Sequence, residues 1–158
     1  MAFPSNIGTQ QDSLQVGWTA ARNAAGQIKQ RAIAVRDMSA SGPVGSSTVL
    51  NLLTLLIDQR AILQRAAALS GMQAYAQEQL GNPVVDIATA FSAMITAMDA
   101  AGTWIIVNFP TITDGSGTYL AAYFWEVGPT GRIQDRQFDT ASLGPLRTLL
   151  NNLILSID

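Results

Sequence analysis

Apolar residues recur every three or four positions along most of the chain, the spacing of helices with one buried face. This pattern predicts four long helices and one short one. The first long helix has a narrow, alanine-rich seam, which favours the close approach of another helix. Its apolar positions are Leu14, Trp18, Ala21, Ala25, Ile28, Ala32 and Val35. Asp12 or Ser13 is the expected N-terminal cap and Ser41-Gly42-Pro43 the end, and the seam faces either the core or a second subunit.

The second long helix is predicted from a cap at Ser46 or Ser47 to about Leu69. Its first half is apolar on nearly every side, from Val49 to Ile57. Such a helix is typical of the centre of a bundle or of a contact between subunits. A short helix is then expected over 72–80, ending at Gly81.

The third long helix is expected to begin at Asn82-Pro83, because Asn is a favoured cap and Pro a favoured first helical residue. Its apolar stripe consists of Ile87, Phe91, Met94, Met98, Ala101, Ile105 and Phe109. The methionines in this stripe indicate core packing, or else an adaptable binding surface. The last helix is predicted after a cap at Asp139 or Thr140, with the stripe Leu143, Leu146, Leu150, Leu153 and Ile157.

Between the last two long helices the pattern becomes that of strands. A loop over 113–117 precedes an aromatic, β-branched segment over 119–127, and a Gly-rich turn leads to an alternating segment over 132–138. We therefore predict a β-hairpin over 118–138, with Tyr119, Tyr123 and Trp125 on one face. A lone hairpin is marginally stable in water, so it must pack on the helices or be completed by another chain.

These elements predict one mainly α domain over residues 1–158. A helical bundle of about four helices is formed by residues 9–109 and 140–157, and the β-hairpin over 118–138 is inserted before the C-terminal helix.

Composition narrows the function. The 158 residues include no Cys and no His, which excludes a thiol nucleophile, a Ser-His-Asp triad and imidazole metal ligands. The pairs Asp86/Asp99 and Asp135/Asp139 have no spacing that brings them together, and Asp114-Gly115-Ser116-Gly117 lacks the further carboxylates of a calcium loop. We expect no enzyme activity, no catalytic residues, no metal and no cofactor.

Charge and hydropathy bear on possible partners. The net charge is −2 and Lys29 is the only lysine, which disfavours specific nucleic-acid binding. The longest apolar run, Val49–Ile57, is too short to span a bilayer, and the N-terminus lacks the pattern of a secretory signal, so we expect no membrane association. Only 13% of residues are charged although 48% are hydrophobic, which favours burial against other chains.

Several segments resemble a known family. They are Gln27–Ala32, Ala74–Gln77, Val85–Ala88, Trp104–Pro110, Gly131–Ile133, Asp135–Phe138 and Leu146–Leu150. Together they are similar to small structural proteins encoded among the virion genes of tailed bacteriophages. The resemblance implies a virion component, made in the host bacterial cytoplasm, that contacts copies of itself and neighbouring portal or capsid proteins.

Within that class, the expected function is a subunit of an oligomeric head–tail connector, in an adaptor or neck ring. The residues expected at the subunit interface are Tyr119, Tyr123, Trp125, Arg132 and Arg136. Two alternatives stay open: a decoration or cement protein of the capsid, and a helical partner-binding protein that never enters the particle.

Overall fold

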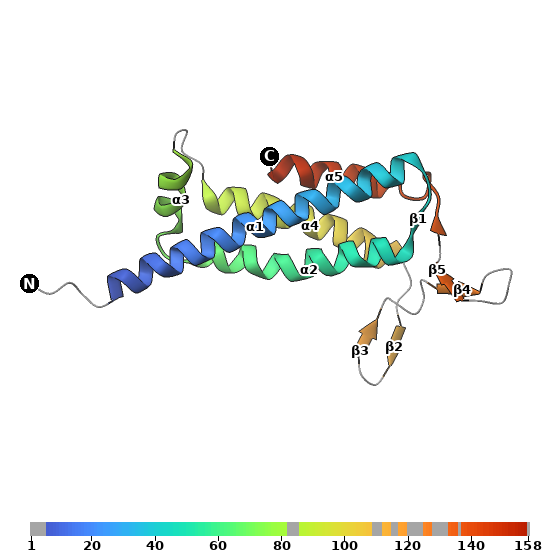
Figure 1. The fold of residues 1–158 in the computed structure, drawn as a ribbon, viewed down its shortest axis with the longest axis horizontal. Coiled ribbons are helices and arrows are strands. Elements are labelled where there is room, and N and C mark those ends of the chain that lie inside the picture. Colours follow the sequence, from blue (N-terminus) through green and yellow to red (C-terminus); the bar gives the residue numbers. More distant parts are fainter. Residues whose placement is uncertain are drawn as a thin grey trace, which may run out of the picture.

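The computed structural model describes residues 6–81, 86–108, 112–114, 117–119, 125–127, 133–135 and 137–157. Within them the chain is mainly helical, as predicted, and it has five helices where a bundle of about four was expected. The long helices α1 (Asn6–Ser41), α2 (Ser46–Ala68), α4 (Ile87–Asn108) and α5 (Gly144–Ile157) lie alongside one another, and the short α3 (Met72–Leu80) crosses one end (Figure 1). Both α1 and α4 pack against α2 and against α5, so the four long helices enclose one core.

The core is formed by the apolar stripes of the helices. In α4 the predicted stripe from Ile87 to Ile105 is buried at every position, and in α1 Trp18, Ala21, Ile28, Ala32 and Val35 are buried. Ala24 is buried in the place expected for Ala25, which is half-buried. This shift follows from the 3.6-residue turn of a straight helix, which drifts away from a strict heptad seam.

Of the two arrangements expected for the apolar first half of α2, the structure does not show the first, a place at the centre of the bundle. Val49, Leu52, Leu53 and Leu56 are buried, but Ile57 is 58% exposed. Helix α2 packs against α1 and α4 through its buried residues, and Ile57 lies outside this contact.

The starts of α1, α2 and α4 differ from the prediction. Helix α1 begins at Asn6, so Asp12 and Ser13 lie inside it, and Gly45 takes the N-cap position of α2. Helix α4 begins at Ile87, while Asn82 and Pro83 lie outside the described residues. Asp86 is its cap: Thr89 N donates to Asp86 Oδ1 at 3.1 Å, and Ile87 N donates to Gln73 Oε1 of α3 at 2.7 Å.

The cap of α4 predicts an acid-sensitive contribution to stability. The hydrogen bonds from Thr89 hold the pKa of Asp86 below its ordinary value, and those from Ser142 do the same for the pKa of Asp139. A lowered folded pKa stabilises the fold above the unfolded value of about 3.9, and this stabilisation is lost as the pH falls through the folded pKa. We expect Asp86→Asn, which keeps a capping oxygen without a titrating group, to lessen the fall in thermal midpoint below about pH 4. An unchanged acid response in Asp86→Asn would contradict this prediction.

The described strands form three antiparallel pairs instead of one hairpin. Strand β1 (Val44–Gly45) pairs with β6 (Gln137–Phe138), β2 (Ile112–Asp114) with β3 (Gly117–Tyr119), and β4 (Trp125–Val127) with β5 (Ile133–Asp135). The hairpin predicted over 118–138 is confirmed where β4 pairs with β5, but it is wrong for 118–119 and 137–138, which pair elsewhere, and 113–117 is not a loop throughout. The pairs β2–β3 and β4–β5 project from the end of the bundle where α4 ends and α5 begins (Figure 1).

Candidate functional site

Two of the five predicted interface residues lie in the strands of the projecting hairpins. Tyr119 is in β3, opposite Ile112, and Trp125 is in β4, opposite Asp135. Tyr123, Arg132 and Arg136 lie outside the described residues. Since Tyr119 and Trp125 belong to different sheets, the prediction that three aromatic residues share one face of a single strand is wrong.

Three of the four carboxylates weighed as catalytic pairs have structural partners. Asp86 caps α4, and Asp139 Oδ1 accepts a hydrogen bond from Ser142 N at 2.8 Å. Asp99 of α4 forms a two-point ion pair with Arg60 of α2, with Nε–Oδ1 at 2.7 Å and Nη2–Oδ2 at 3.0 Å. Among the described residues no group of three or more acidic side chains is placed to hold a metal ion.

A groove of about 810 Å³ lies between α4 and α5. Its lining contains no charged side chain, and on α4 it consists only of small residues. These are Ala88, Thr89, Ser92, Ala93, Thr96, Ala97 and Ala100, with Leu149, Asn152 and Ser156 on α5. The groove has hydroxyl groups but no acid or base, so it suits close contact with an uncharged surface better than a reaction.

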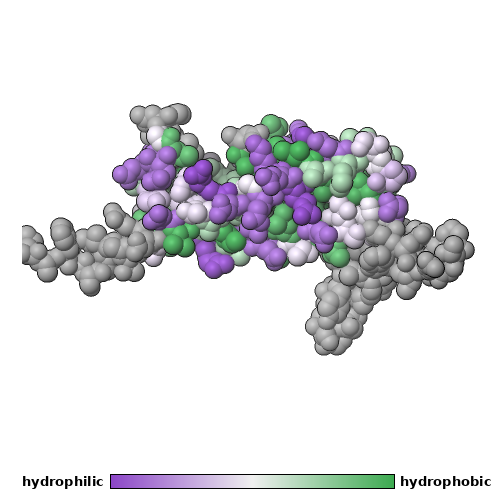
Figure 2. Space-filling model, in the orientation of Figure 1, coloured by the Kyte–Doolittle hydropathy of each residue, from purple (hydrophilic) through white to green (hydrophobic). Residues whose placement is uncertain are grey.

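A second groove, with aliphatic side chains and the Arg60–Asp99 ion pair in its lining, lies between α2 and α4. Ile57 is 58% exposed and Ile106 is 49% exposed, and both border this groove of about 240 Å³. Figure 2 shows hydrophobic patches between hydrophilic ones along the visible face of the bundle. Exposed aliphatic residues beside a groove are typical of surfaces that contact other proteins.

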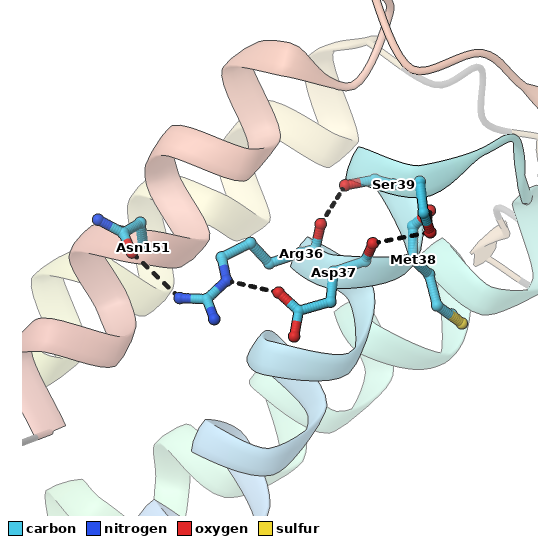
Figure 3. A network of polar contacts seen from close by, with 6 residues as sticks. Arg36, Asp37, Met38, Ser39 and Asn151 are labelled. Carbon is cyan, nitrogen blue, oxygen red and sulfur yellow. Dashed lines mark hydrogen bonds and ion pairs between the residues drawn. The ribbon is translucent and has the colours of Figure 1, made fainter.

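Polar contacts join α1 and α5 near the end of the bundle that carries the hairpins. Arg36 donates from Nε to Asp37 Oδ1 at 3.0 Å and from Nη1 to Asn151 Oδ1 of α5 at 3.2 Å (Figure 3). The buried Ser39 donates from Oγ to the carbonyl oxygen of Arg36 at 2.9 Å. These contacts fix the last turns of α1 beside α5.

Helix α4 is long and apolar enough to cross a membrane, by length and composition only. The sequence of α4 contains no long uninterrupted apolar run, because threonine, serine and aspartate residues separate its apolar residues. Core helices of soluble proteins meet the same criterion, and the stripe from Ile87 to Ile105 lies in the core of the bundle. The absence of membrane association stays a prediction.

Comparisons with protein-family models, with curated proteins and with solved structures give no match for this chain. The function therefore has to be argued from the sequence and from the geometry of the described residues.

Proposed function

We propose that this chain is a structural protein of a tailed-bacteriophage particle, present in many copies as a subunit of a ring at the head–tail junction. The observation that carries the proposal is the pair of short hairpins, β2–β3 and β4–β5, that project from one end of a helical bundle (Figure 1). The resemblance of the sequence to small virion proteins supplies the class of particle.

The hairpins suit contacts between subunits because their described strands make few contacts within one chain. Each described strand among the four is three residues long and is paired on one edge only, and none of the four has extensive contact with a helix. An unpaired strand edge can bind a strand of a neighbouring chain through its backbone. Tyr119 and Trp125 lie on these strands, and aromatic residues are enriched at protein interfaces.

The sides of the bundle suit the same arrangement. The groove between α4 and α5 has no charged side chain in its lining, and the surface around Ile57 and Ile106 has exposed aliphatic side chains next to a single ion pair, Arg60–Asp99. Helices of adjacent subunits can pack closely where side chains are small and charges are absent. The low charge of the whole chain, 13% of residues, agrees with such burial.

Mass measurements test the proposal. A ring subunit is expected to be monomeric or weakly associated alone, and to form a large complex of defined mass when mixed with the portal protein of the same phage. A stable trimer of the free chain would contradict the ring and favour a capsid decoration protein. Absence of the chain from purified particles, measured by mass spectrometry, would contradict both virion functions and favour a partner-binding protein outside the particle.

Trp125→Ala is expected to impair assembly strongly while changing the thermal midpoint of the free chain little, because β4 lies outside the bundle. Assembly is measured as the fraction of chain in the large complex, and the midpoint by circular dichroism. Trp104→Ala is the matched control: Trp104 packs against the core from α4, so its loss is expected to lower the midpoint. A large fall in midpoint for Trp125→Ala would place that ring in the core instead.

A further inference from the structure

The strands that follow α4 differ in what they pair with. Strands β2 to β5 pair only within their own hairpins, and no described residue of theirs makes extensive contact with a helix. Strand β6, only two residues beyond β5, pairs instead with β1 in the connection between α1 and α2. The boundary between projecting strands and bundle therefore falls between Asp135 and Gln137.

The segment from Gln137 to Leu143 is tied to the bundle by its backbone and by its apolar side chains. Val44 of β1, which pairs with Phe138, is buried, and Phe138 itself packs against the core. Leu143 is fully buried at the start of α5. Between them, the turn is closed by the hydrogen bond from Ser142 N to Asp139 Oδ1 at 2.8 Å.

One side chain joins this segment to α1. Arg147, in the first turn of α5, donates from Nη1 to the carbonyl oxygen of Thr140 at 2.7 Å and to that of Ser39 at 2.9 Å. Ser39 lies in the last turn of α1, whose carbonyl groups lack partners within the helix. A guanidinium group at that helix end is also favoured by the helix dipole.

We propose that residues 137–143 and Arg147 form an anchor that closes the bundle independently of the paired strands β2 to β5, so that loss of these strand pairs leaves the helices folded. Short two-stranded hairpins are marginally stable alone, whereas the anchor shares the stability of the core. Pairing with a second copy of this chain would then stabilise strands β2 to β5, a step that rests on the proposed function. The anchor holds the base of β5 in a fixed place, which lowers the entropic cost of that pairing.

Hydrogen exchange of the full chain, read by mass spectrometry, tests the anchor. Amides of β2 to β5 are expected to exchange at least about 100-fold faster than those of Gln137, Phe138 and the core of α5. In Arg147→Met we expect exchange over 137–143 to accelerate about 10-fold or more, with rates in β2 to β5 unchanged. Strand amides protected as well as those of α5, or an unchanged 137–143 segment in Arg147→Met, would overturn the anchor.

Two further variants keep the result interpretable. Arg36→Met is the control, because the Arg36 guanidinium joins α1 to Asn151 of α5 and not to residues 137–143. In this variant residues 137–143 should keep their exchange rates. Acceleration equal to that in Arg147→Met would overturn the role of Arg147. If Arg147→Met fails to fold, Arg147→Lys, which keeps the charge but not the forked donor, should accelerate 137–143 alone, and acceleration spread through α1 and α2 would overturn the proposal.

A strand-breaking variant tests the independence of the bundle. Val127→Pro removes a pairing residue of β4, opposite Ile133, and is expected to shift the thermal midpoint of the helices by less than about 2 °C. A fall of more than about 5 °C would overturn the anchor. All these measurements are made on the free chain. The anchor proposal can therefore be supported even if the chain is absent from particles, and it can be contradicted even if the chain assembles.

Discussion

Replacing Leu150 with alanine is expected to lower the free energy of unfolding by about 3 kcal/mol. Leu150 is fully buried in α5, and α5 packs against both α1 and α4. The substitution removes apolar groups from the core and leaves a cavity that the surrounding helices fill only in part. Urea unfolding followed by circular dichroism measures the change, with the slope of the transition expected to stay the same.

Leu155→Ala is the matched control for Leu150→Ala. Leu155 lies in the same helix but is 64% exposed, so its truncation should change the free energy of unfolding by less than about 0.5 kcal/mol. Equal losses for the two variants would show that α5 buries a different face from the one described.

Ala32→Leu is expected to cost about 2 kcal/mol of stability, although leucine is the more hydrophobic residue. Ala32 has no exposed surface, and its helix packs against α2 and α5. The added carbon atoms have no space there, so the helices must move apart or the side chain must take a strained rotamer. The loss should appear in urea unfolding and as a lower thermal midpoint.

The control for Ala32→Leu lies two residues further along the same helix. Ala34 is exposed, and Ala34→Leu should change stability by less than about 0.5 kcal/mol. A destabilisation of Ala34→Leu equal to that of Ala32→Leu would show that the alanine positions of α1 are not distinguished by close helix packing.

The helices could be predicted from the sequence because their period is a local property. The stripe from Ile87 to Ile105 and the short helix over 72–80 were found in this way, and the structure confirms both. The start of α4 could not be predicted, since Asn82-Pro83 and Asp86 are both good start signals. The contact from Ile87 N to Gln73 Oε1, between α3 and α4, favours the second, and no local pattern contains it.

The strands were harder to predict because pairing joins distant parts of the chain. The alternating segment over 132–138 was recognised, but Gln137 and Phe138 pair with Val44 and Gly45 instead of continuing the hairpin. Arg147 was missed as well, because a guanidinium that binds two carbonyl groups leaves no motif. The sequence does contain one indication of this role. Arg147 is the only charged residue of α5 within Gly144–Ile157, and a charged side chain in an apolar helix is stable only with a polar partner.

The pairing of β1 with β6 also determines how freely the inserted segment can vary in length. It fixes the returning end of the segment on the bundle, and the end of α4 fixes its departure. The entropy of closing a loop between two fixed points grows only with the logarithm of its length, so doubling the loop costs about 0.6 kcal/mol. Inserted segments of other lengths or sequences can therefore be accommodated at this position at little thermodynamic cost, while the helices and their core stay the same.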